Sequence, residues 1–122
     1  MVIFTKTTDF LAWLTPATNH FPRAHRYGAT QRLLDAAYDF LEHITEANNQ
    51  RGVDRLRLLA VASGELDKVR LYLRLAHAWR WLNDGQYAHC SRMVAEIGRM
   101  LGGWQKTTRQ DLDGARQHRA GQ

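Results

Sequence analysis

Apolar side chains recur along this sequence at steps of three and four residues, the spacing that places them on one face of a helix. Near the end of the chain the residues at these steps are Val94, Ile97, Leu101 and Trp104. Gly98 lies within this stretch, where a missing side chain lets a neighbouring helix approach closely, at a cost of about 1 kcal/mol relative to alanine. Gly102 and Gly103 predict the end of this helix, because glycine commonly takes the left-handed position there.

The same spacing predicts four helices joined by short turns. Residues 1–6 are predicted to be a poorly ordered lead, and Thr7 or Thr8 can cap the first helix, which ends near Asn19. The other predicted helices span residues 23–48, 54–82 and 86 to 101 or 104. Long helices joined by turns of a few residues are antiparallel neighbours, so the sequence predicts an all-α fold, an up-down antiparallel four-helix bundle.

The pattern divides the chain into a bundle, residues 1–106, and a tail, residues 107–122. The tail has no periodic apolar residues, and Arg109, Arg116 and Arg119 alternate there with Gln, Asp and Gly. Such a composition is typical of a flexible, mildly basic segment.

The helix predicted over residues 54–82 carries more apolar surface than one bundle core needs. One line of apolar side chains consists of Leu56, Leu59, Ala62, Leu66, Val69, Leu73 and Ala76, and a second consists of Leu58, Leu71, Leu75, Ala78 and Leu82. Because monomers seldom leave wide apolar stripes exposed, we interpret the surplus as a subunit interface.

Length and composition indicate one domain whose core needs no disulfide. The chain has 122 residues, of which 44% are hydrophobic and 24% charged, ordinary values for a globular protein. The single cysteine, Cys90, excludes an intrachain disulfide and favours a reducing, cytoplasmic compartment. No apolar run approaches the roughly 20 residues that span a bilayer, and no signal-peptide pattern opens the sequence, so no membrane association is expected.

Charge narrows the range of partners. The formal net charge is +5, and of the 17 basic residues 14 are arginine and three are lysine. Arginine pairs bidentately with phosphate and stacks on bases, whereas lysine acts as a point charge. This bias favours nucleic acid as a partner. The alternative explanation is a GC-rich genome, which favours arginine codons.

No pattern of catalytic, cofactor-binding or metal-ligating residues is present. Gly102 and Gly103 are not followed by the Lys-Ser/Thr pair of a phosphate-binding loop. Glu42 and His43 are adjacent, whereas di-iron bundles need them three residues apart. The six histidines show no metal spacing, and the neighbours His89 and Cys90 point in different directions. We therefore expect a protein that is not an enzyme and has no cofactor.

Basic side chains on the third predicted helix are the strongest candidates for binding. Arg70, Arg74, His77 and Trp81 step by four, three and four residues, so they share one helical face, with Arg80 beside them. Basic residues interleaved with aromatic ones suit phosphate contact and base stacking. The nucleic-acid-binding residues that we predict are Arg70, Arg74 and Arg80, supported near helix ends by Arg23, Arg26 and Arg99.

Two other interpretations of these residues stay open. In the first, the arginines form a solvated helix face, and Trp79 and Trp81 pack in the core or at an interface. In the second, Arg74 and Arg80 form ion pairs with acids of the second predicted helix. Those acids are Asp35, Asp39 and Glu42.

Several stretches together resemble a known family of four-helix bundles. The matching stretches are Leu14-Thr15-Pro16, His20-Phe21-Pro22-Arg23 followed by Arg26, Gln31-Arg32-Leu33, Glu46-Ala47-Asn48, Leu71-Tyr72-Leu73-Arg74-Leu75-Ala76 and Glu96-Ile97-Gly98-Arg99-Met100-Leu101-Gly102-Gly103-Trp104. They extend over roughly residues 8–106. The family that they resemble includes the accessory variability determinant (Avd) of diversity-generating retroelements and the proteins encoded in intervening sequences of 23S ribosomal RNA genes.

The resemblance implies a non-enzymatic homopentamer, a barrel of five bundles whose basic surface binds RNA and DNA. In the retroelements this accessory subunit associates with a reverse transcriptase and its template RNA, and is needed for mutagenic cDNA synthesis. The intervening-sequence relatives share the bundle but have no well-defined activity. The alternative is therefore a structural or protein-interaction bundle, and the arginine-rich charge favours the retroelement branch.

Overall fold

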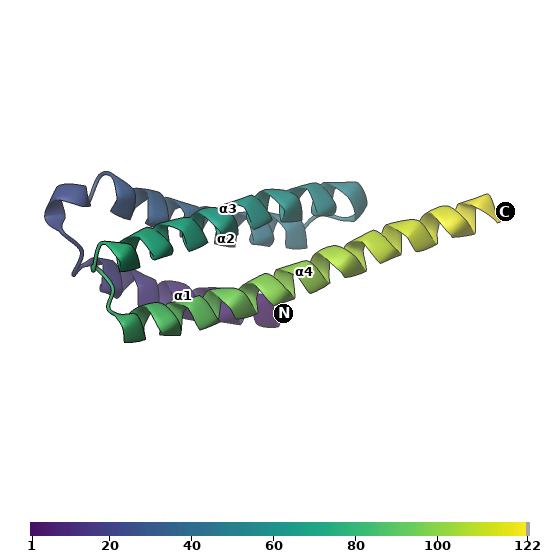
Figure 1. Cartoon of the computed structure of the whole chain (residues 1–122). Coiled ribbons are helices and arrows are strands. Elements are labelled where there is room, and N and C mark those ends of the chain that lie inside the picture. Colours follow the sequence, from purple (N-terminus) through teal and green to yellow (C-terminus); the bar gives the residue numbers. More distant parts are fainter. Residues whose placement is uncertain (122) are drawn as a thin grey trace.

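Four α-helices and one short 3₁₀ helix form the protein, of which a computed structural model describes residues 1–121. The elements are α1 (Val2–Thr18), η1 (Arg23–His25), α2 (Ala29–Asn48), α3 (Gly52–Ala78) and α4 (Asp84–Ala120). α2 packs against α3, α3 against α4, and α1 against both α4 and α2. Consecutive helices run in opposite directions, and α4 projects beyond the other three (Figure 1). The predicted all-α, up-down four-helix bundle is confirmed, and the predicted pentamer stays a prediction.

The core lies between the four helices along the predicted apolar faces. Its buried side chains include Leu33, Phe40 and Ile44 of α2, Leu59, Leu66, Val69 and Leu73 of α3, and Val94, Ile97 and Leu101 of α4. Each large side chain removed from water contributes about 1.5–3 kcal/mol. This burial gives α2, α3 and α4 a common interior, against which α1 packs with Phe10 and Leu14.

α1 begins at Val2, so the prediction of a disordered lead before Thr7 was wrong. Thr7 is 1% exposed, and its hydroxyl donates to the carbonyl oxygen of Ile3 over 2.7 Å. A threonine that bonds to the carbonyl four residues earlier sits inside a helix and does not cap it. With Ile3 also buried, the first turn of α1 is part of the core.

α2 begins at Ala29 and not at Arg23, because the chain first forms η1 and a turn that ends at Gly28. Tyr27 precedes this start and is 86% exposed. The predicted break around residues 19–22 and the predicted end of α2 at Asn48 are both confirmed.

α4 continues through Gly102 and Gly103 to Ala120, so the predicted helix end at Leu101 or Trp104 was wrong. Thr108 explains the continuation. It is 4% exposed and its hydroxyl donates to the carbonyl oxygen of Trp104 over 2.8 Å, so a residue counted as polar extends the buried face. The tail predicted from residue 107 is therefore helical as far as Ala120, and residue 122 lies outside the described residues. The boundary between bundle and tail stays a prediction.

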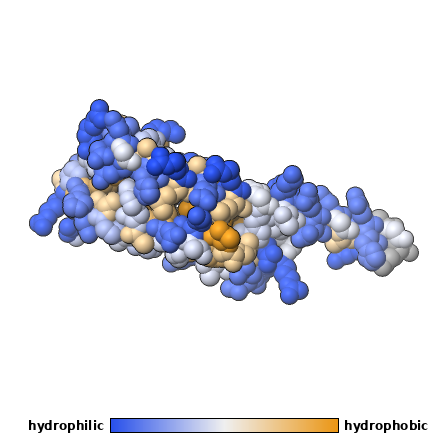
Figure 2. Space-filling view, turned by 90° about the horizontal axis from the view of Figure 1, so that it is seen from below, coloured by the Kyte–Doolittle hydropathy of each residue, from blue (hydrophilic) through white to orange (hydrophobic). Residues whose placement is uncertain are grey.

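Surface chemistry differs between the bundle and the projecting end of α4. Figure 2 shows hydrophobic surface on the bundle and mostly hydrophilic surface along the projection. On the bundle, Met1 and Val2 are exposed at the start of α1, beside a hollow lined by Met100 and Trp104. The start of α3 lies against the first part of the projection, where Leu112 borders Gly52.

Candidate nucleic-acid interface

The guanidinium group of Arg70 lies between α3 and α4, over a glycine of α4. A Cβ atom on Gly98 would collide with Nη2 of Arg70, so residue 98 makes room for this guanidinium by having no side chain. Nη1 of Arg70 donates to Oδ1 of Asp67 over 2.8 Å, and the Arg70 side chain is 41% exposed. We predicted that the missing side chain of Gly98 lets a neighbouring helix approach closely. The space is instead filled by a half-buried arginine.

Arg74 lies one turn further along α3 and is exposed. Together with Arg70 it lines a small hollow of about 150 Å³ between α3 and α4. The α4 side of this hollow is lined by Tyr87, Ser91, Val94 and Ala95. Among the residues that the structure describes, no acidic side chain lies within ion-pair distance of Arg74. The predicted shared face of Arg70 and Arg74 is present, and Arg74 is the more accessible of the two.

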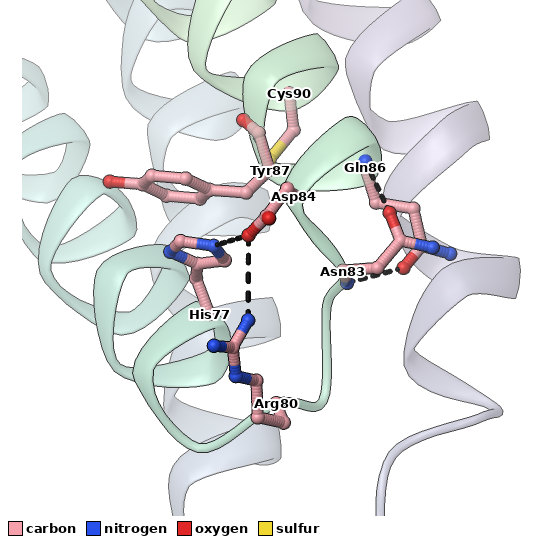
Figure 3. A network of polar contacts seen from close by, with 7 residues as sticks. All are labelled: His77, Arg80, Asn83, Asp84, Gln86, Tyr87 and Cys90. Atoms are coloured by element: carbon pink, nitrogen blue, oxygen red, sulfur yellow. Dashed lines mark hydrogen bonds and ion pairs between the residues drawn. The ribbon is translucent and has the colours of Figure 1, made fainter.

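Where α3 meets α4, three charged or titratable side chains form a polar network (Figure 3). His77 donates from Nε2 to Oδ1 of Asp84 over 2.8 Å, and Nη1 of Arg80 lies 3.5 Å from the same oxygen. The ring of His77 stacks on Tyr87, with centroids 4.3 Å apart and 5° between the ring planes. The hydrogen bond from His77 and then the charge of Arg80 lower the pKa of the Asp84 carboxyl. The positive charge of Arg80 is thus partly balanced by an acid of α4.

The first turn of α4 is fixed by a capping box, also visible in Figure 3. The side chain of Asn83 accepts a hydrogen bond from the backbone N–H of Gln86 over 2.8 Å. The side chain of Gln86 accepts one from the backbone N–H of Asn83 over 2.9 Å. Two donors that a helix start leaves unpaired are satisfied in this way. The cap fixes Asp84, and through it the positions of His77 and Arg80.

α3 ends at Ala78 and not at Leu82, which changes the placement of the residues that follow. Arg80 and Trp81 do not continue the helical face of Arg70 and Arg74, so that part of the prediction was wrong. Trp81 is half-buried, but Trp79 is 49% exposed. Trp79 is therefore not in the core of the single chain, and its packing at an interface stays a prediction.

Arg23 and Arg26 are exposed residues at the end of the bundle where α1 leads into α2. They line a hollow of about 480 Å³ together with Phe21, Pro22, Tyr27, Thr30 and Leu34. Within the described part of the chain neither arginine forms an ion pair. η1 and the α3–α4 turn lie at the same end of the bundle (Figure 1), so Arg23 and Arg26 are at the end that also holds Arg80.

Arg99 is exposed on α4 and belongs to a line of basic side chains that the sequence analysis missed. Arg92 lies seven residues before it and Lys106 seven residues after it, and all three are exposed. Seven residues are about two helical turns, so the three side chains share one face. The spacing was visible in the sequence. It was overlooked because the helix was predicted to end before Lys106.

The ion pairs predicted as an alternative do not occur in residues 1–121. Arg80 pairs with Asp84 of α4, Arg70 pairs with Asp67 of its own helix, and Arg74 has no acidic partner there. The prediction that Arg74 and Arg80 pair with acids of α2 was therefore wrong. Exposed guanidinium groups without an acidic partner remain available to an external anion.

The chemistry of Cys90 does not suit a nucleophile. Its side chain is fully buried, and burial raises the pKa of the thiol to about 11, so the thiol stays protonated at neutral pH. The neighbouring His89 packs against Trp13, with ring centroids 5.5 Å apart. In residues 1–121 no three side chains of His, Cys, Asp or Glu gather as a possible metal site. None of the helices in this range has a stretch long and apolar enough to cross a membrane.

Comparisons with known proteins agree with the resemblance that the sequence suggested. A search of curated proteins found no match. Among solved structures, a protein of unknown function from the S23 ribosomal protein family of Bacteroides thetaiotaomicron has a similar fold, with a TM-score of 0.76 and 16% sequence identity. The similarity covers 85% of this chain and 98% of that protein. The model of the bAvd-like family matches residues 1–108, and the chain therefore belongs to the bAvd-like family.

Proposed function

We propose that this protein is a non-enzymatic, cytoplasmic accessory subunit of a diversity-generating retroelement, which binds template RNA and cDNA through its arginines. The observation that carries the proposal is the exposure of the six predicted arginines and their lack or possession of an acidic partner. Four of them, Arg23, Arg26, Arg74 and Arg99, are exposed and have no acidic partner within residues 1–121. Uncompensated arginines are the residues that neutralise phosphates, and membership of the bAvd-like family supports the same function.

The proposal includes a closed homo-oligomer, a pentamer, and association with a reverse transcriptase. Apolar side chains that remain exposed on α3 support an interface between copies, namely Val53, Val61 and Leu71. A ring would repeat each arginine around its axis, and repeated weak contacts raise the total affinity for a long strand. Light scattering at micromolar concentration tests the oligomer, and a monomeric mass contradicts it. Co-purification with the reverse transcriptase of the same locus tests the partner.

Nucleic-acid binding is tested by measuring the affinity for RNA and DNA over a salt series. Electrostatic binding predicts that log affinity falls linearly with log salt. Arg74→Glu is expected to weaken binding and to flatten the slope by about one unit per lost phosphate contact. Arg57→Glu is the matched control, because it changes the net charge equally at the other end of α3, where Arg57 pairs with Asp54.

Two results would contradict the proposed binding. Absence of binding at low salt would favour the alternative function, a structural or protein-interaction bundle. An equal loss of affinity in Arg74→Glu and Arg57→Glu would indicate that only the total charge matters, and the assignment of Arg74 as a contact residue would be wrong.

A further inference from the structure

The turn between α3 and α4 holds an arginine in a conformation that glycine prefers. Arg80 has a φ of 63°. The N–H of Trp81 bonds to the carbonyl of Ala76 over 2.8 Å, and the N–H of Arg80 to that of His77 over 3.0 Å. These are the two hydrogen bonds of a Schellman motif, and glycine is usual where Arg80 stands because a Cβ atom is strained there. Residues held in such conformations concentrate at functional sites.

Four rings gather beside this turn, and we name them the aromatic cluster: Phe21, His25, Trp79 and Trp81. Trp81 is the centre, with its ring centroid 5.4 Å from Phe21, 4.9 Å from His25 and 5.0 Å from Trp79. Phe21 is buried and Trp81 half-buried, which fastens the cluster to the bundle. His25 and Trp79 are exposed, so the cluster presents aromatic surface to solvent at the end of the molecule.

Arginines flank the aromatic cluster on both of the segments that form it. Arg23 and Arg26 stand on either side of His25 in and after η1, and Arg80 directly follows Trp79. The Arg80 side chain is 77% exposed and lies at 3.5 Å from Asp84, the acid that its charge partly balances. The two segments thus combine exposed rings with guanidinium groups, the combination found where proteins bind single strands.

We propose that the aromatic cluster and its arginines bind unpaired nucleotides of single-stranded RNA or DNA. One base stacks on Trp79, and neighbouring phosphates contact Arg23, Arg26 and Arg80. The inference rests on the proposed function and adds to it a preference for unpaired strands and the residues responsible. In a duplex the bases are already stacked and paired, so only an unpaired base gains from an exposed ring.

The hollow of about 480 Å³ beside the cluster extends the same site. Phe21 belongs to both, and the walls of the hollow are largely apolar. Arg23 and Arg26 also line the hollow, so the proposed site places there the nucleotide that follows the one on Trp79.

The experiment compares two probes on the full chain: an unstructured oligouridine strand and an RNA duplex of the same length. Trp79→Ala is expected to lower affinity for the strand by roughly 5- to 150-fold, the range for one stacked base, and to leave duplex affinity unchanged. Trp79→Phe keeps a ring and is expected to retain most of the affinity. The strand, but not the duplex, is expected to quench tryptophan fluorescence in the wild type and less so in Trp79→Ala.

Arg80→Gly is a second variant, and its folding is not expected to be impaired. Glycine suits the φ of Arg80, so this variant is expected to melt no lower than the wild type while it binds the strand more weakly. The inference is overturned if Trp79→Ala binds the strand as the wild type does, or loses strand and duplex affinity equally. Either outcome leaves the proposed function standing, whereas a wild-type protein that binds neither probe overturns both.

Discussion

Replacing Gly98 by alanine tests how α3 and α4 fit together. In most helix interiors this change stabilises by about 1 kcal/mol, because glycine loses more backbone freedom on folding. At residue 98 the new Cβ atom collides with Nη2 of Arg70 and lies 3.7 Å from Cδ2 of Leu66. The guanidinium group is the far end of a flexible chain, so it moves away, and the backbone of the two helices is expected to stay in place.

Moving the guanidinium of Arg70 has a cost that offsets part of the gain. The exposed pair with Asp67, at a spacing of three residues, contributes about 0.3–0.5 kcal/mol. Contacts of the guanidinium with α4 are lost in addition. We therefore expect Gly98→Ala to stabilise by no more than about 0.5 kcal/mol. Gly102 is the matched control, since it lies one turn later on α4 and no atom of the described residues lies within 4 Å of its added Cβ. Gly102→Ala is expected to stabilise by about 1 kcal/mol, or about 4 °C in Tm.

A double-mutant cycle isolates the contact between residues 98 and 70. In the background Arg70→Ala, Gly98→Ala is expected to give the full stabilisation of about 1 kcal/mol, because no guanidinium remains to be displaced. The assay is denaturant unfolding at one fixed protein concentration, since assembly links stability to concentration. Equal effects of Gly98→Ala in the two backgrounds would refute the packing of Arg70 over Gly98.

Three further predictions concern stability away from the candidate interface. Gly52→Ala is expected to lower the free energy of unfolding by about 1–2 kcal/mol, measured by denaturant unfolding, because Gly52 has a φ of 60° and alanine is strained there. Ile44→Ala, in the core, is expected to cost about 2–5 kcal/mol in the same assay. A hydrogen bond to Glu65 raises the pKa of His43, and burial raises that of Glu65, so the folded state binds more protons than the unfolded state. The free energy of unfolding is therefore expected to fall as the pH rises from about 4.5 to above 6.5. Glu65→Gln is expected to flatten this pH profile, which thermal unfolding at a series of pH values measures.

Apolar periodicity was sufficient to predict the bundle, because it reports directly which faces are buried. It failed at helix ends where threonine replaced an apolar residue. Thr7 and Thr108 are buried with their hydroxyls bonded to the backbone carbonyl four residues earlier. A threonine in this arrangement behaves as a core residue, yet its usual association with caps suggested that α1 begins later than it does. α4 was predicted too short because Gly102 and Gly103 suggested a helix end and Thr108 was counted as a polar residue.

The candidate interface was predictable in its charges but not in its shape. Arginine content and the spacing of Arg70 and Arg74 follow from the sequence, since they need only the helical period. The position of the Arg70 guanidinium over Gly98 depends on the distance between two helices, which no local pattern encodes.

The α3–α4 turn was predicted wrongly because Arg80 occupies a position where glycine is usual. A glycine at residue 80 would have marked the end of α3, and an arginine there let the predicted helix run on through Trp81. With the helix extended, Trp79 was expected to pack in the core or at an interface, and in the single chain it is exposed. Departures from local preference are most often retained where a site needs the side chain itself. Arg80 is such a departure: glycine would suit the turn better but would remove the guanidinium of the residue that follows Trp79. The residue that misled the sequence analysis is therefore the one that points most directly to the aromatic cluster as a binding site.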